Sequence, residues 1–288
     1  GYDVLREQRY QRMLDLGIIE SDAPLPLHHA DFEEGWPAWE SLSPQQQEAW
    51  IEEMATYAAM VEIMDDGIGQ TIELLKERGM YENSVIIFLS DNGATMEGGE
   101  ASQLAAALSN TPYRSYKQFT HAGGISSPLI IHAPQALAGT NQLEESVSHI
   151  IDLMPTSLEI AGIDYPESFR GQAIDAPDGL SLSPLLEGGK LAERDLFFEH
   201  QTASAIISDG FKLVRMHVDQ PWELYNLAED PFETNNLATA QNEIVEHLEA
   251  RWTQWAERND VFPLEPKPWR ERVRYYRAKF PDQDGVDG

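Results

Sequence analysis

Apolar residues recur along the chain at two different spacings, and these spacings divide it into helices and strands. Intervals of three and four predict an amphipathic helix over residues 3–16, which ends at Gly17, and a long helix from Ser43 to Gly79. Ser43 is a favourable N-cap, and Pro44 suits the first helical position because the N–H it lacks would have no partner there. We expect the Met and aromatic stripe of the long helix to be buried in a core.

A short apolar run, Val85–Leu89, stops abruptly at Ser90, Asp91, Asn92 and Gly93. Five consecutive apolar residues rich in β-branched side chains predict a strand buried on both faces, as in a parallel sheet covered by helices. A second buried strand is predicted at Leu129–His132, and the segment between the strands from Ala94 to Asn110 is expected to be a loop. A helix at Asp152–Ala161 extends this α/β pattern.

The pattern changes near Leu196, where short strands follow one another closely. They are predicted at Leu196–His200, Ser204–Ser208, Phe211–Met216 and Trp222–Tyr225. Asp209-Gly210 is a strong hairpin signal, and a helix is predicted from Gln241 to Arg258. Strands in succession followed by a helix are typical of an antiparallel α+β unit. We therefore expect residues 1–195 to belong to an α/β domain and residues 196–288 to form a smaller α+β subdomain.

The composition, 42% apolar and 24% charged over 288 residues, is that of a globular chain. There are 49 acidic residues against 20 Lys and Arg, so the formal net charge of −29 disfavours binding to nucleic acid or to anionic membranes. No segment approaches the ~18 unbroken apolar residues of a membrane span. The chain contains no Cys, so it has neither a disulfide nor a thiolate metal site, and its compartment stays undetermined.

The first candidate site is the pair Asp91 and Asn92. In open α/β sheets ligands collect beyond the carboxyl ends of the strands, which is where these side chains would lie. A carboxylate beside an amide carbonyl suits a hard divalent cation such as Ca²⁺ or Mg²⁺. Asp-Asn-Gly after a strand is also an ordinary turn sequence. The three residues alone leave both interpretations open.

Three segments taken together carry a resemblance to a known family. Residues 88–93 read FLSDNG, residues 117–128 read KQFTHAGGISSP, and residues 223–238 read ELYNLAEDPFETNNLA. Their order and spacing resemble the C-terminal half of the type I sulfatases, in particular bacterial arylsulfatases. The opening YDVLREQR and the helical YAAMVEIMDDGIGQTIELL look like the same family, so the resemblance covers nearly the whole chain.

The resemblance implies an alkaline-phosphatase-like α/β domain, with a mostly parallel sheet and a smaller C-terminal subdomain, that hydrolyses sulfate esters of small molecules or saccharides. It implies a Ca²⁺ ion, in preference to Mg²⁺, held by four side chains, two of which match Asp91 and Asn92. It also implies that Lys117, ahead of the Gly-Gly corner, contacts the sulfate group. The family's nucleophile is a formylglycine made from Cys or Ser in a C/S-x-P-x-R motif.

Several parts of the family pattern are missing from this sequence. It has no Cys and no Ser-x-Pro-x-Arg, and it lacks the early Asp-Asp pair, the Lys-x-His stretch and the His-x-Pro stretch. We expect these in an N-terminal half that precedes Gly1 and acts as this chain's partner, and we expect the chain alone to be inactive. Ala122 stands where Glu usually precedes the two glycines, a change expected to be structural only.

Each assignment has a simpler alternative. Lys117 alone could be a surface lysine, although its flanking motif favours a functional role. His121 could face the pocket or cap the glycine corner, His200 could rim a cleft or be structural, and Arg114 is expected to be a scaffold residue. The parent could instead be a phosphodiesterase or phosphonate monoester hydrolase, or a non-catalytic interaction domain. The loops expected to select the ester are residues 20–42 and 94–110. The sequence indicates neither which ester they select nor the oligomeric state.

Overall fold

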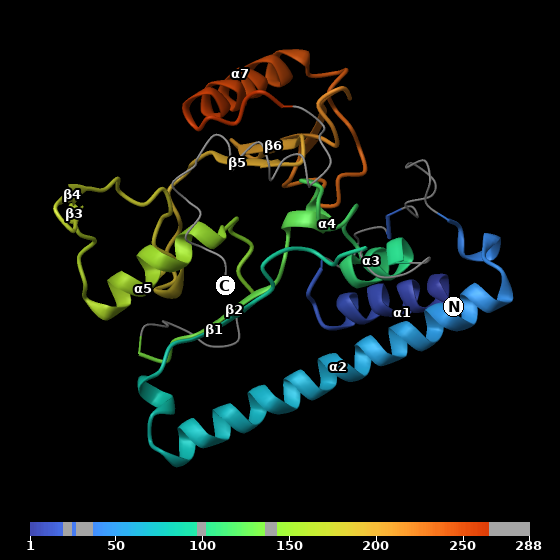
Figure 1. Cartoon of the computed structure of the whole chain (residues 1–288), viewed down its shortest axis with the longest axis horizontal. Helices are drawn as coiled ribbons and strands as arrows, with labels where there is room; N and C mark the ends of the chain where they lie inside the picture. The colour runs from blue at the N-terminus through green and yellow to red at the C-terminus, as the bar shows by residue number, and fades with distance from the viewer. Residues whose placement is uncertain (20–24, 27–36, 97–101, 136–142, 265–288) are drawn as a thin grey trace.

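The structure, a computed structural model of the 288-residue chain, describes residues 1–19, 25–26, 37–96, 102–135 and 143–264. Three helices form its N-terminal part (Figure 1): α1 (Tyr2–Asp15), α2 (Pro44–Glu77) and α3 (Ser102–Asn110). Within the described chain, none of the helices is long and apolar enough to cross a membrane. The loops proposed to select the ester lie partly outside these residues, at 20–24, 27–36 and 97–101.

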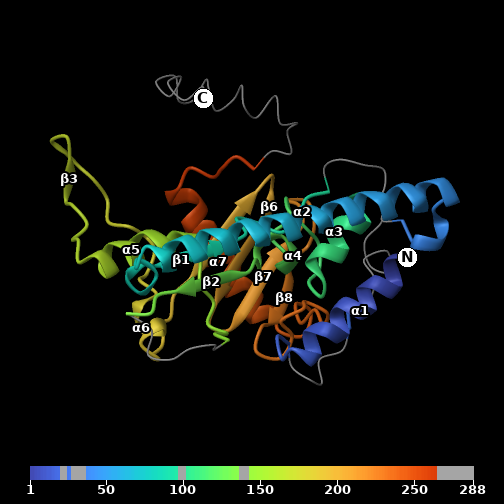
Figure 2. The same cartoon turned by 90° about the horizontal axis from the view of Figure 1, so that it is seen from below.

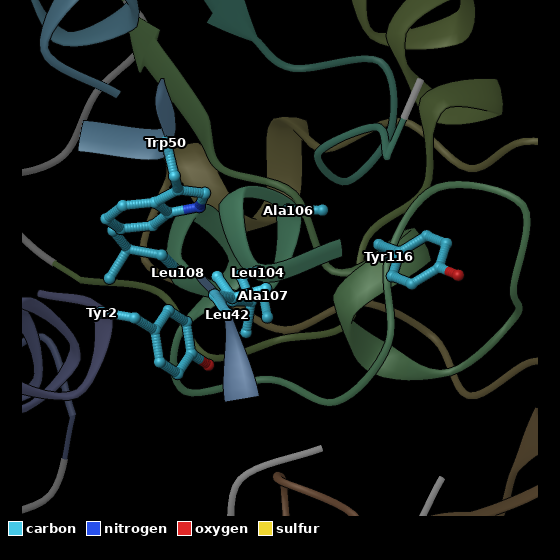
Figure 3. Close-up of a cluster of buried hydrophobic side chains, with 8 residues drawn as sticks. All are labelled: Tyr2, Leu42, Trp50, Leu104, Ala106, Ala107, Leu108 and Tyr116. Atoms are coloured by element: carbon cyan, nitrogen blue, oxygen red, sulfur yellow. The ribbon is translucent and has the colours of Figure 1, made fainter. Parts of the chain in front are cut away.

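The N-terminal core forms where α3 meets the starts of α1 and α2 (Figure 3). Trp50 of α2 is its centre and makes edge-on contacts with Tyr2 and Trp39, at ring-centroid distances of 6.2 and 5.1 Å. Leu104 and the alanines of α3 fill the remaining space. The loop expected from Ala94 to Asn110 is thus wrong for its second half, because Leu and Ala are strong helix formers and here pack as a helix.

Helix α2 begins as predicted but is not buried as predicted. Ser43 and Gln46 form a reciprocal capping box before Pro44. Of the whole helix only Trp50 is fully buried, and the expected core stripe is exposed through its middle at Tyr57, Val61 and Met64. Figure 2 shows α2 crossing the near side of the molecule, with no other described segment in front of it. The spacing predicted the helix correctly, but the described chain supplies little to cover it.

The strands predicted around the Asp-Asn pair are present, but their pairing differs from the expectation. β1 (Ile86–Leu89) pairs with β2 (Leu129–His132) in antiparallel register, with Ile86 opposite His132. All four residues of β1 are only half-buried, and Ile130 of β2 is 60% exposed. The expectation of a parallel neighbour and two buried faces is wrong for this pair, because a continuous apolar run carries no information about strand direction.

Shorter elements lie between these longer ones and before the C-terminal part. They are η2 (Trp39–Ser41), η3 (Tyr81–Asn83), α4 (Ala122–Ile125), η4 (Ile150–Asp152), α5 (Leu153–Ala161), β3 (Ser168–Phe169), β4 (Gln172–Ala173) and α6 (Ser183–Leu186). The helix predicted at Asp152–Ala161 is therefore confirmed as α5 with η4 before it.

The C-terminal unit, defined as β5–β8 with α7, follows the sequence prediction closely. Its sheet runs in the order β5-β6-β7-β8, all antiparallel, from β5 (Leu196–His200), β6 (Ala203–Ser208), β7 (Phe211–Arg215) and β8 (Glu223–Asn226). Asp209 and Gly210 both have positive φ, 52° and 79°, as the tight hairpin between β6 and β7 requires. α7 (Asn242–Arg258) completes the unit.

The two faces of this sheet have different partners. One face packs on α7 through an apolar cluster of Ile206, Leu213, Leu224, Leu248, Trp252 and Ala256. The other face carries Ala205, Val214 and Tyr225. In Figure 1 α7 lies on one side of the sheet and α4, which contains the glycine corner, lies on the opposite side. The second face of the sheet is therefore directed at the motif that the sequence singled out.

Candidate functional site

The Asp-Asn-Gly turn packs tightly on the glycine corner. The Gly93 N–H donates to the Gly124 carbonyl at 2.9 Å, and a Cβ on Gly93 would lie 1.7 Å from the Gly123 oxygen. The approach leaves no room for any side chain at position 93, so a glycine is needed there. This contact places Asp91 and Asn92 beside the corner that follows Lys117.

Lys117 lies in the same cluster of loops. Its backbone N–H donates to the Ala94 carbonyl at 2.9 Å, two residues beyond Asn92. Asp91 is exposed, while Asn92 and Lys117 are half-buried. Over the residues that the structure describes, none of these three side chains has a hydrogen-bond or ion-pair partner. The structure therefore brings the three predicted residues into adjoining segments, with their polar groups available to a ligand.

The backbone around Lys117 is strained. Ser115 and Gln118, on either side of it, have φ of 63° and 93°, values that non-glycine residues rarely adopt. Such conformations persist only where the surrounding contacts determine them, and they cluster at functional sites. We call residues 114–122 the Lys117 loop.

Glu223 of β8 contacts Arg114 at the beginning of this loop and His121 near its end. Its carboxylate accepts hydrogen bonds from the Arg114 guanidinium at 2.6 Å and the Tyr225 hydroxyl at 2.5 Å, and the Nε2 of His121 lies 3.4 Å away. Burial alone would raise the pKa of Glu223, but His121, Arg114 and Tyr225 outweigh it and hold that pKa well below its usual range. Glu223 is therefore a charged anchor.

Glu233 contacts the end of the loop. One carboxylate oxygen accepts the Ala122 N–H at 3.0 Å, and the other accepts a short hydrogen bond from the Lys212 ammonium of β7. Both side chains of this pair are within 2% of complete burial. Burial lowers the pKa of Lys212, and the Glu233 carboxylate opposes that effect. A buried pair of this kind is costly to break, because the remaining charge would have no partner.

The other residues considered in the sequence are Arg114, His121 and His200, and the structure gives each of them a partner. Arg114 is a scaffold residue, as expected, and His121 is fully buried against Glu223 rather than facing a pocket. His200 is exposed, with its Nδ1 3.1 Å from the Gln118 carbonyl, so it has a backbone partner and also borders the Lys117 loop.

Asp91 and Asn92 are suited to a cation but provide only part of a site. Carboxylate and amide oxygens are the donors that Ca²⁺ and Mg²⁺ prefer, and Ca²⁺ takes six to eight of them. In the described ranges no group of three or more His, Cys, Asp or Glu side chains could hold a metal ion. The donor types fit, and further ligands would have to come from elsewhere.

Glu223 and Glu233 were quoted in the sequence motif but given no role. A signal for Glu233 exists in β7, where Lys212 lies two residues before Val214, on the same face of the strand, and both are buried. A lysine at a buried strand position requires a buried acid as its partner. The sequence does not say which of the many acids that partner is.

Two protein-family models match this chain. The sulfatase family model matches residues 23–163, and the model described as N-sulphoglucosamine sulphohydrolase, C-terminal, matches residues 114–258. An uncharacterized sulfatase from Schizosaccharomyces pombe is 30% identical over 289 residues, covering 88% of this chain and 51% of its own length. An arylsulfatase from Klebsiella aerogenes is 33% identical over 213 residues, covering 64% and 45%.

The fold is similar to that of a solved protein, Ps i-CgsB, in complex with k-i-k-neocarrahexaose. The TM-score is 0.59 at 20% identity, covering 98% of this chain and 60% of that one. The described fold is thus that of an alkaline-phosphatase-like α/β protein, as predicted, but the strand pairs in the described ranges are all antiparallel and do not include the mostly parallel sheet that was expected. With the two family matches, the chain belongs to the type I sulfatase family. It spans about half the length of the curated relatives it matches, 51% and 45% for the first two.

Proposed function

We propose that this chain is the C-terminal portion of a Ca²⁺-dependent sulfatase that hydrolyses sulfate esters of small molecules or saccharides. In this proposal Lys117 contacts the sulfate group, and Asp91 and Asn92 supply two of the metal ligands. The formylglycine nucleophile and the other ligands belong to an N-terminal half. The fold's similarity to a protein solved with k-i-k-neocarrahexaose supports a saccharide among the candidate substrates.

The observation that carries the proposal is the position of Lys117. Its segment is hydrogen-bonded to the chain just beyond the Asp-Asn pair, and its ammonium has no partner among the described residues. The net charge of −29 repels anions, so an anionic ester needs local positive charge. An unpaired lysine on a segment that adjoins two oxygen donors for a divalent cation supplies such a charge.

The chemistry of the ester explains why these residue types suit it. The peripheral oxygens of a sulfate monoester are negatively charged, and the leaving oxygen gains charge as the S–O bond breaks. Cations directed at these oxygens therefore lower the barrier. A bound Ca²⁺ supplies Lewis acidity for this purpose. Lys117 is a compact point charge that can meet a tetrahedral anion without a fixed bidentate geometry.

The exposed middle of α2 supports the proposed N-terminal half. Seven apolar side chains along the helix are 41–70% exposed: Ile51, Tyr57, Met60, Val61, Ile63, Met64 and Leu74. An apolar surface of this extent marks an interaction site. β1 and β2 also form only a two-stranded sheet, which is marginally stable without further neighbours. The curated relatives are about twice as long as their matched parts, so they have additional chain that could cover such a surface.

Replacing Lys117 in the intact parent protein tests the catalytic assignment. We expect Lys117→Ala to lower kcat/KM for p-nitrophenyl sulfate by about 100-fold to 1000-fold, the usual loss for one well-aimed electrostatic contact. Lys190→Ala, at an exposed lysine far along the chain, is the matched control and should keep full activity. Equal activities for the two variants would rule out the assignment of Lys117.

A second set of measurements separates the alternatives. Asp91→Ala in the intact parent should weaken Ca²⁺ binding in a titration, and unchanged affinity would favour a simple turn.

The 288-residue chain alone should not hydrolyse p-nitrophenyl sulfate with Ca²⁺ present, and saturable turnover would contradict the need for another half. A parent that prefers phosphonate or phosphate esters to sulfate esters would be the phosphonate hydrolase or phosphodiesterase instead.

A further inference from the structure

The Lys117 loop is held at both ends by the C-terminal unit. Arg114, three residues before Lys117, is bound by Glu223, and Ala122, five residues after it, is bound by Glu233. The two acids come from β8 and from the turn that follows it, about 110 residues further along the chain. No other part of the described chain contributes charged side chains to both ends of this loop.

The loop is also closed on itself between these two anchors. The Gly123 N–H donates to the Arg114 carbonyl at 2.6 Å, and the Gly124 N–H donates to the His121 carbonyl at 2.9 Å. A Cβ on Gly123 would lie 2.1 Å from the Ser115 carbonyl oxygen, so the closure depends on bare backbone. The strained Ser115 and Gln118 therefore lie inside a small ring whose two ends the acids fix.

We infer that Glu223 and Glu233 are positioning residues for Lys117, because they hold the strained loop against the segment that follows the Asp91-Asn92 turn. This inference rests on the proposed function for the role of Lys117, but the anchoring itself does not. The C-terminal unit then fixes the position of the Lys117 loop and is not only an appended subdomain.

The kind of anchor supports this role. Neither acid reaches the Asp-Asn-Gly turn in any hydrogen bond that the described residues make, so each acts through the loop. Glu233 is fully buried and uses both oxygens, one on the loop and one on Lys212 of the sheet. An acid that served the sheet alone would have no need to bind the Ala122 N–H.

Hydrogen exchange on the 288-residue chain tests the anchoring without any assay of activity. Glu233→Gln keeps an oxygen for the Ala122 N–H but removes the charge that pairs with Lys212. We expect exchange in residues 114–124 to accelerate about tenfold or more, as for loss of a charge-assisted hydrogen bond, while β5, β6 and α7 stay protected.

The matched control is Asp152→Asn, which disrupts an equally buried acid paired with Arg194 outside the loop. It should leave exchange at 114–124 unchanged. Glu223→Gln, at a partly exposed acid, serves if Glu233→Gln does not fold, and should accelerate the same segment. Uniform acceleration across the sheet, or none at the loop, would overturn the inference.

A double-mutant cycle in the intact parent tests the link to Lys117. If Glu233 acts through Lys117, adding Glu233→Gln to Lys117→Ala lowers kcat/KM no further than Lys117→Ala alone. Losses that multiply would show that Glu233 acts elsewhere and would overturn the positioning role. If Lys117→Ala leaves kcat/KM unchanged, the proposed function is refuted instead. The exchange experiment would still decide the anchoring.

Discussion

At the scale of single residues, the site depends on where backbone meets backbone. Lys117 lies on a different turn from Asp91 and Asn92, and what joins these two turns is the contact of Gly93 with Gly123 and Gly124. The glycines therefore contribute to the site as much as the polar side chains do. A residue without a side chain allows two loops to approach within hydrogen-bond distance.

Gly93→Ala should disrupt this contact. The added Cβ would lie 1.7 Å from the Gly123 oxygen, so one loop must move, at a cost of about 1–3 kcal/mol in the free energy of unfolding. Urea denaturation measures the change. Gly67→Ala on α2, where a Cβ meets nothing within 4 Å, is the control and should stabilise the chain by about 0.5–1 kcal/mol. A neutral Gly93→Ala variant would contradict the tight approach.

The buried carboxylates make stability depend on acid. Burial alone would raise the pKa of Glu223 and of Asp152, but the hydrogen bonds and positive charges of their partners lower both below the ordinary values of 4.5 and 3.8. The unfolded chain therefore binds protons more readily than the folded chain at these groups. Their stabilisation is complete above about pH 5 and is lost as the pH falls below the ordinary values.

Urea denaturation between pH 6 and pH 3 measures this dependence. The free energy of unfolding should fall on the acid side, and Glu223→Gln should have a shallower slope because one of the linked protons is gone. A slope identical to that of the unchanged chain would mean that Glu223 is not held in its charged form.

At the scale of elements, local signals placed the helix and hairpin ends accurately. α2 starts at the Ser43-Pro44 pair, and the β6–β7 hairpin turns at Asp209-Gly210. These signals act within a few residues, so the rest of the fold hardly alters them. Local signals do not determine which elements pair or in which direction, as the antiparallel pairing of β1 with β2 shows.

Ser43→Ala tests the local contribution of the capping box. The Ser43 Oγ accepts from the Gln46 N–H at 3.3 Å, and its loss should lower the free energy of unfolding by about 1 kcal/mol. Thr56→Ala is the control, since its hydroxyl bonds only a carbonyl of the same helix and alanine is the better helix former. Equal stabilities for the two variants would mean that the start of α2 frays in the folded chain.

At the scale of the whole molecule, the described chain leaves a long apolar helix uncovered. α2 has 34 residues and so extends about 50 Å, and only its first turns join the N-terminal core. Its middle is apolar on several sides, the pattern of a helix with neighbours around it. A chain with net charge −29 stays dispersed through charge repulsion, but this surface opposes that tendency.

We therefore expect the isolated chain to self-associate through α2. Ile63, 70% exposed, is at the middle of this surface, and Ile63→Lys should shift the chain toward the monomer in sedimentation velocity. Val4→Lys, at a 60% exposed residue of α1, is the control and should leave the association unchanged. Association that persists equally in both variants would place the contact elsewhere.

The candidate site was predictable in part. Asp91, Asn92 and Lys117 follow from motifs that can be read along the chain, and the structure brings their segments together. Glu223 and Glu233 were not predicted, because an acid's role depends on what it meets. Arg114 and Glu223 are 109 residues apart in the sequence, and no periodic pattern spans that interval.

The sequence by itself determined the elements, their caps and turns, and the order of the motifs, since each depends on interactions between near neighbours in the chain. Only the tertiary structure decided which faces are covered, which way β1 and β2 pair, and which acids hold the Lys117 loop. Burial and ion pairing depend on groups brought together from distant positions, so their energies are defined only once the chain is folded.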